Sequence, residues 1–203
     1  MVTDSAVPGG RGQAHTLEAV VASLVLLSSI VFALQMTAVT PLSASTSSQH
    51  LENQQNEIAR GVLAAAAEHG ALKRTLLTWN DSAGRFFNAS DLGYYTNRVP
   101  PTEFGAMLNR SFDRRGLAYN VYLRYRTAGG DSVSRRLVYQ GVPSDNAVRT
   151  AYPVTVFQND QLHDHRGDPT GTPVNETSTF YAANVDDSSV YNVVRVEVVT
   201  WRI

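Results

Sequence analysis

The chain has 203 residues, of which 43% are hydrophobic and 17% are charged, and its formal net charge at pH 7 is −1. This length predicts one domain with room for an appended segment. The near-balance of charges argues against a nucleic-acid-binding protein, which needs an excess of Lys and Arg on one face. The chain contains no cysteine, which excludes disulfides, thiolate metal sites and cysteine nucleophiles.

The N-terminal part of the chain is a polar leader followed by a long apolar segment. Residues 1–12 are small and polar, whereas no residue from Ala19 to Val39 carries a charge. A helix of that length spans roughly 30 Å, which is the thickness of the hydrocarbon core of a bilayer. We therefore predict a transmembrane helix over residues 13–40. A buried core helix and a secretory signal peptide cleaved near Ala33 or Ala44 are the alternatives.

The flanking charges predict the orientation of this helix. Arg11 and the amino terminus precede the apolar segment, and no Lys or Arg follows it until Arg60. The positive-inside rule then places the N-terminus in the cytoplasm and residues 41–203 outside the cell.

The residues that precede the apolar segment resemble a known processing signal. The stretch from Arg11 to Glu18 reads Arg-Gly-Gln-Ala-His-Thr-Leu-Glu, and it is similar to the class III signal peptide of archaeal type IV pilins and archaellins, including pilin-like proteins of halophilic archaea. The resemblance implies that a prepilin peptidase cuts between Gly12 and Gln13. It also implies that the apolar helix stays on the mature protein and packs against self or other pilin-like subunits in a filament.

Glu18 is the charged residue at the start of the apolar segment. It would be the sixth mature residue after cleavage before Gln13, one position later than the glutamate of the pilin family. A carboxylate at a membrane helix end is costly unless it is paired, so Glu18 is a candidate acceptor for the α-amino group of a neighbouring subunit. Alternatively, it lies among lipid headgroups, where negative charge suits the N-terminus of a helix.

Residues 41–203 are expected to form an extracellular α+β head domain. Pro41–Ser48 is a polar segment that predicts a hinge, and an apolar seam predicts a helix over about 49–79. The members of that seam are Ile58, Val62, Ala65, His69, Leu72, Leu76 and Trp79. The resemblance to pilins implies that this amphipathic helix packs on an antiparallel β-sheet.

The rest of the head is predicted to be β-rich over residues 116–203. The pattern indicates a loop over 80–97 and a short helix at Glu103–Arg110, and alternating or β-branched residues indicate strands. The strands are expected at 117–125, 132–140, 152–157 and, more weakly, 179–183, with a central strand at 190–203 and a loop over 159–178.

Candidate modification sites are sequons for N-glycosylation at Asn80, Asn88, Asn109 and Asn175. Asn80, Asn88 and Asn175 lie in predicted loops outside the membrane, and the sequence therefore predicts a glycoprotein. Asn109 lies in a predicted helix, where modification is less favoured.

Other chemistry-bearing patterns are sparse. His163, His165 and Asp168 have the residue types of a metal site, but their Gly- and Pro-rich surroundings indicate a solvated loop, so we predict no metal. Asp186-Asp187 is interpreted as a turn rather than a calcium site. The basic pairs Arg114-Arg115 and Arg135-Arg136 are interpreted as solvated charges, with acidic neighbours or glycans as the alternative partners.

These patterns together predict a cell-surface structural protein. The sequence lacks nucleotide-binding, nucleophile-elbow and zinc-protease motifs, so we expect no catalytic residues, no cofactors and no enzyme activity. The leading hypothesis is a major or minor pilin-like subunit of a pilus or pseudopilus, with the membrane and a prepilin peptidase as partners. The alternatives are a monomeric membrane-anchored binding domain and an enzyme whose site the sequence does not reveal.

Overall fold

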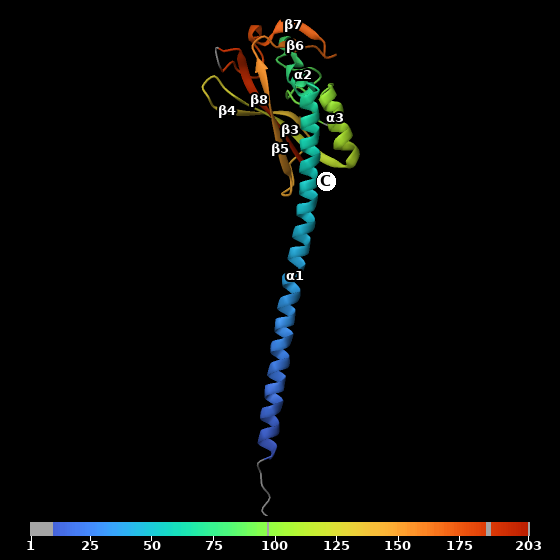
Figure 1. Ribbon diagram of the computed structural model, residues 1–203, viewed down its shortest axis with the longest axis vertical. Helices are drawn as coiled ribbons and strands as arrows, with labels where there is room; N and C mark the ends of the chain where they lie inside the picture. Colours follow the sequence, from blue (N-terminus) through green and yellow to red (C-terminus); the bar gives the residue numbers. More distant parts are fainter. Residues whose placement is uncertain (1–9, 97, 186–187, 203) are drawn as a thin grey trace, which may run out of the picture. The chain divides into compact units, whose positions relative to one another are not determined.

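The computed structural model describes the backbone of residues 10–96, 98–185 and 188–202, and it describes side chains within these ranges except at 10–13 and 36–48. The chain divides into two compact units, Met1–Gln49 and His50–Ile203. The protein is α+β, with a long apolar helix at its N-terminus and antiparallel sheets in the second unit (Figure 1).

Helix α1 extends over Gly10–Glu68 and therefore begins before the predicted start at Gln13. The sequence predicts a hinge over the polar segment 41–48, and the structure assigns the backbone of this segment to helix α1. A proline removes a single intrahelical hydrogen bond, and the neighbouring residues continue the helical conformation past Pro41. The side chains of this segment lie outside the described residues.

The helix predicted over 49–79 is interrupted at Gly70. Helix α1 ends at Glu68 and α2 covers Ala71–Leu77. Gly70 has a φ of 68°, a left-handed conformation that glycine adopts without steric cost and that commonly ends helices. Trp79, expected at the end of the helix, lies instead in strand β1 (Trp79–Asn80).

The main sheet has the strand order β4-β3-β8-β5, with every pairing antiparallel. Its strands are β3 (Leu117–Arg126), β4 (Ser132–Tyr139), β5 (Val148–Phe157) and β8 (Val190–Arg202). The prediction of a central C-terminal strand is confirmed, because β8 pairs with both β3 and β5. The strand predicted at 152–157 is also correct, although β5 begins earlier.

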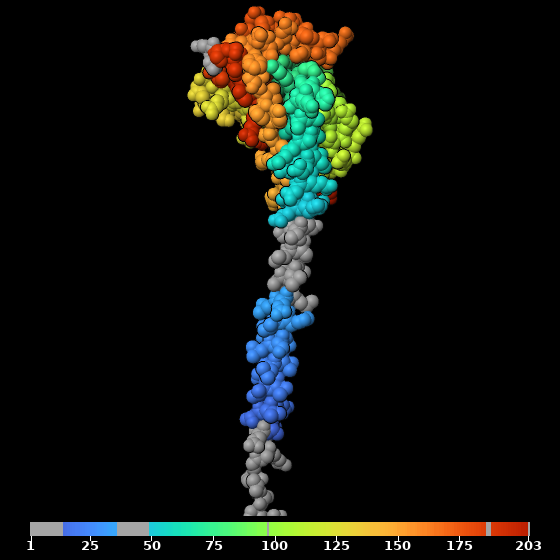
Figure 2. Space-filling model, in the orientation of Figure 1, coloured from blue at the N-terminus to red at the C-terminus, as the bar shows by residue number. Residues whose placement is uncertain are grey.

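One face of this sheet packs against the end of α1. Ala59, Val62, Leu63 and Ala66 of α1 belong to the same buried cluster as valines of the sheet such as Val196. The segments of α1 and β5 lie side by side in the head (Figure 2), and Thr150 Oγ1 donates a hydrogen bond to Asn56 Oδ1 at 2.8 Å. His69, expected on the apolar seam, is exposed.

Two short strand pairs lie where the sequence predicts loops. Strands β1 and β2 (Arg85–Phe86) pair around the 3-10 turn η1 (Asp81–Ala83). Strands β6 (Gln161–His163) and β7 (Pro169–Pro173) pair within the region predicted as a loop, and the 3-10 turn η3 (Val174–Glu176) follows them. The Asp and Gly residues that suggested a loop form the hairpin turn, in which Gly167 has a φ of 88°.

Residues 179–183, predicted as a weak strand, do not form a strand in the structure. Their aromatic side chains pack instead into a cluster with Trp79, whose ring centroid lies 6.1 Å from that of Phe180 and 5.5 Å from that of Tyr181. Adjacent aromatic side chains such as Phe180 and Tyr181 can be buried without a ladder of backbone hydrogen bonds, which explains the incorrect prediction.

Helix α3 (Glu103–Ser111) confirms the short helix expected at Glu103–Arg110. The Thr102 side chain accepts a hydrogen bond from the backbone N–H of Gly105 at 3.3 Å and so caps its N-terminus. A second 3-10 turn, η2 (Asp113–Arg115), connects α3 to β3.

Candidate membrane and assembly segment

The segment Ala14–Gln35 of α1 is the part of the described chain that is long and apolar enough to span a membrane. It has 22 residues and a mean hydropathy of 2.4, and none of its side chains is buried. Large apolar side chains around its whole circumference are exposed, including Leu24 at 59% and Phe32 at 65%. A helix that is apolar on every side is typical of a membrane span or of a helix enclosed by others.

Two serines in the middle of this segment make their hydrogen bonds within the helix. Ser28 Oγ donates to the carbonyl of Leu24 at 2.7 Å, and Ser29 Oγ donates to that of Val25 at 2.8 Å. Because these hydroxyls bond to the preceding turn, they need no water and do not oppose transfer of the helix to an apolar environment.

Glu18 lies near the start of this segment with an exposed side chain. One carboxylate oxygen is 3.7 Å from Nδ1 of His15, and the two side chains are 80% and 82% exposed. An exposed pair at this separation contributes little stability, so the carboxylate of Glu18 stays open to another partner. The predicted cleavage site is Gly12 and Gln13, whose side chains lie outside the described residues, as does all of 1–9.

The four sequon asparagines lie on the head, and their glycosylation stays a prediction. Asn88 and Asn175 are exposed, and Asn88 has a φ of 60°. Asn80 is partly buried and caps η1 by accepting a hydrogen bond from the Ala83 N–H at 3.1 Å. Asn109 lies on α3, and its amide donates to Asp113 at 3.1 Å.

The structure separates the residues of the only cluster with metal-ligand chemistry in the sequence. His163 lies on β6 and is partly buried, whereas His165 and Asp168 are exposed in the turn. Asp164 accepts backbone hydrogen bonds from Asp168 and Arg166 at 3.0 and 2.8 Å, and these bonds lower the pKa of its carboxyl. Among the described side chains, no group of three or more His, Asp or Glu residues is placed to hold a metal ion. Asp186-Asp187 lies outside the described residues.

The two basic pairs have different environments. The Arg135 guanidinium lies 5.1 Å from the centre of the Trp79 ring, and that of Arg136 lies 4.2 Å from the centre of the Tyr139 ring. Arg135 is partly buried, so its contact has a structural role, whereas Arg136 is exposed, as expected for a solvated charge. Arg115 is exposed, and Arg114 lines a cleft.

That cleft contains functional candidates that the sequence analysis did not single out. Arg74, Arg110 and Arg166 line it together with Arg114. Arg110 and Arg114 are four residues apart, but Arg74 and Arg166 come from distant parts of the chain, so the sequence does not indicate that all four lie together.

Comparison with known proteins places the chain in a family. A family model described as a family of unknown function, DUF7288, matches residues 11–200. The chain belongs to DUF7288. No curated protein and no solved structure matches it. The match to DUF7288 covers the Arg-Gly-Gln junction, the apolar segment and the head down to strand β8, so the apolar helix and the head are parts of one family architecture.

Proposed function

We propose that this protein is a pilin-like cell-surface subunit. Its N-terminal helix anchors it in the cell membrane, with the N-terminus in the cytoplasm and the head outside. A prepilin peptidase then removes the leader before Gln13, and the helix assembles with other such helices into a pilus or pseudopilus. The observation that carries the proposal is that Ala14–Gln35 buries none of its side chains.

The energetics of this segment support a non-aqueous environment for it. Exposure of apolar surface to water costs about 25 cal/mol per Å², and the apolar side chains surround the helix. Lipid removes that cost in a membrane, and the helices of neighbouring subunits remove it in a filament. A subunit that moves from the membrane into a filament needs a helix that is stable in both environments.

The head supports the same proposal through its connection to the anchor. The last part of α1 is buried in the head core through residues such as Ala59, Leu63 and Ala66. The anchor and the core element are thus consecutive parts of one helical segment, as in the pilin architecture that the junction at Gly12 resembles.

Glu18 is the residue through which we expect subunits to be aligned. Cleavage before Gln13 creates a new α-amino group close to the start of the apolar segment. The exposed carboxylate of Glu18 is available to a neighbour's amino group, and in an apolar surrounding an unpaired charge is costly. Pairing of these charges would select one axial stagger between adjacent helices.

Disulfide cross-linking tests assembly directly, because the chain has no native cysteine. The double variant Leu24→Cys/Phe32→Cys carries two thiols at exposed positions of the apolar segment. Mild oxidation of intact cells is expected to produce a ladder of covalent oligomers beyond the dimer, since packed helices bring thiols from several copies together.

The control for random collision is Val142→Cys, which places one thiol on the head at a residue that is 82% exposed. Comparable dimer yields from this control and from the helix variant, with no higher oligomers, would contradict assembly. That result would support the alternative, a monomeric membrane-anchored binding domain.

A further inference from the structure

A cleft in the head combines basic side chains from distant parts of the chain. It has a volume of about 730 Å³ and lies among α2, α3, η2 and the β6–β7 turn. Figure 1 shows α2 between α3 and the β6–β7 hairpin. The four arginines around it are Arg74 on α2, Arg110 on α3, Arg114 on η2 and Arg166 in the β6–β7 turn.

The positive charge of this cleft is not neutralised from within. Glu103 is the one carboxylate among the described residues that line it, and it pairs with Arg74 at 2.5 Å. No ion pair with Arg110, Arg114 or Arg166 occurs in the described part of the chain. The lining therefore carries a clear net positive charge.

Two nearby carboxylates, those of Asp113 and Asp164, are engaged by other donors. Asp113 accepts hydrogen bonds from the amide of Asn109 at 3.1 Å, from the hydroxyl of Tyr119 at 3.2 Å and from the amide of Gln140 at 3.2 Å. Asp164 accepts two backbone N–H groups of its own turn. These bonds fix the carboxylates in structural roles and leave the guanidinium groups for an external anion.

The wall of the cleft is held in place by close packing. A Cβ atom on Gly105 would lie 2.0 Å from the carbonyl oxygen of Pro100, so α3 approaches the segment before it as closely as only glycine permits. Thr75 Oγ1 donates to Thr102 Oγ1 at 2.8 Å and connects α2 to the start of α3. A preformed wall lowers the ordering cost of binding.

We propose that this cleft binds a small organic oxyanion, a carboxylate or phosphate carried on a molecule the size of one to three sugar rings. Planar guanidinium groups match both carboxylate and phosphate with paired hydrogen bonds. The volume lies within the range of roughly 300–1,000 Å³ that is usual for small-molecule sites. Val99, Pro100, Pro101 and Ala106 line the cleft as well and contact the carbon skeleton of the ligand.

Calorimetric titration of the full chain in detergent, without glycans and at low salt, tests this proposal. The probes are trigalacturonate, which carries carboxylates, tripolyphosphate, which carries phosphates, and the neutral sugar maltotriose. We expect one binding site for trigalacturonate, tripolyphosphate or both, and no binding of maltotriose. Binding of trigalacturonate alone identifies a carboxylate ligand, and binding of tripolyphosphate alone identifies a phosphate ligand.

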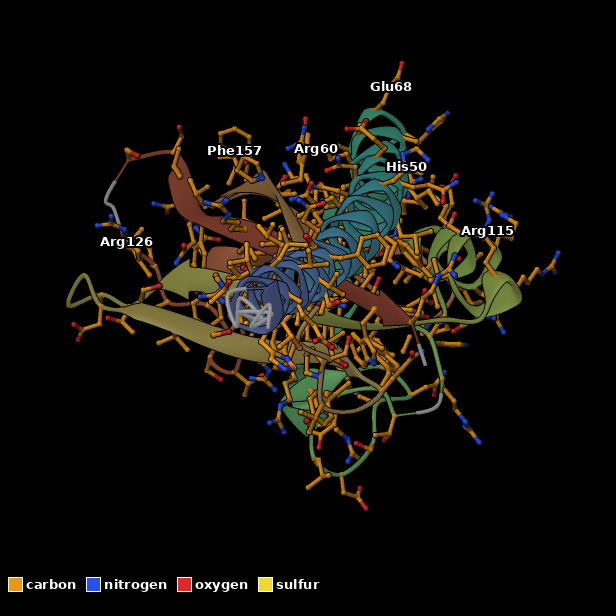
Figure 3. The ribbon with its side chains drawn as sticks, turned by 90° about the horizontal axis from the view of Figure 1, so that it is seen from below. His50, Arg60, Glu68, Arg115, Arg126 and Phe157 are labelled. Atoms are coloured by element: carbon orange, nitrogen blue, oxygen red, sulfur yellow. The ribbon has the colours of Figure 1, made fainter. Side chains whose placement is uncertain are left out.

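The variant Arg110→Gln/Arg114→Gln is expected to weaken binding by at least about tenfold, because each lost hydrogen bond to a charged group is costly. Its matched control is Arg115→Gln/Arg126→Gln, which removes the same charge at exposed residues outside the cleft. Figure 3 shows Arg115 and Arg126 on opposite sides of the head. The control is expected to change affinity less than about twofold, because neither Arg115 nor Arg126 lines the cleft.

A second variant, Arg166→Gln, removes a cleft arginine from the β6–β7 turn and is also expected to weaken binding. It provides the test if the double variant does not fold. The proposal is overturned if neither anion binds, if maltotriose binds equally well, or if the control weakens binding as much as the cleft variants do. The cleft lies wholly within the head unit, so these results are independent of helix assembly.

Discussion

His163 places a ring nitrogen where it has no partner. Its Nδ1 atom is buried and lacks a hydrogen bond among the described residues. Burial lowers the pKa of this imidazole and the charge of Arg74 lowers it further, while the carboxylates of Asp160, Asp164 and Asp168 oppose the shift. The fold therefore favours the neutral ring.

This lowered pKa predicts an acid-sensitive stability. Below about pH 6.5 an unfolded chain protonates His163 more readily than the folded chain does, so the free energy of unfolding falls on acidification. Replacement by His163→Gln is expected to make the melting temperature less dependent on pH between about pH 7.5 and pH 5.5.

The control for this prediction is His165→Gln, which changes an exposed histidine in the same hairpin. Thermal melts of the wild-type chain and both variants at the two pH values provide the comparison. The interpretation fails if His163→Gln retains the full wild-type pH dependence, or if His165→Gln loses as much of it.

At the scale of elements, the break between α1 and α2 depends on one residue. Gly70 has a φ of 68°, and a side chain at that left-handed position costs roughly 1–2 kcal/mol. Gly61 lies within α1, and a Cβ added there meets nothing within 4 Å. The two glycines of the same helical region are therefore expected to respond in opposite ways to alanine.

Gly70→Ala should lower the free energy of unfolding by roughly 1–2 kcal/mol, whereas Gly61→Ala should raise it by about 1 kcal/mol, because alanine is the better helix former. Denaturant titration followed by circular dichroism measures both changes. Equal effects of the two substitutions, in either direction, would show that the chain does not turn at Gly70 as described.

The elements with a strong local pattern were predictable from the sequence. The alternation over 117–125 and 190–203 is a local signal for strands, and both segments form strands, β3 and β8. The end of α1 was not predictable, because one glycine either weakens a helix, as Gly61 does, or terminates it, as Gly70 does.

At the scale of the whole molecule, the apolar helix could be predicted and the cleft could not. An unbroken run of uncharged residues is visible in the sequence, and the structure contains a helix there that is suited to a membrane. Arg74 and Arg166 line the same cleft although most of the head sequence separates them. The elements between them determine that they lie close together. Arg114 and Arg115 are adjacent and both exposed, so the sequence does not distinguish them, but Arg114 lines the cleft and Arg115 does not.

The mature N-terminus is the measurement that tests the proposed function most directly. Mass spectrometry of the membrane-extracted protein is expected to find a chain that begins at Gln13 and retains the apolar segment, because cleavage before that segment is the step that separates a pilin-like subunit from a plain anchor. A chain that begins at Met1 or Val2, or one that begins beyond Ala33, would contradict the proposal.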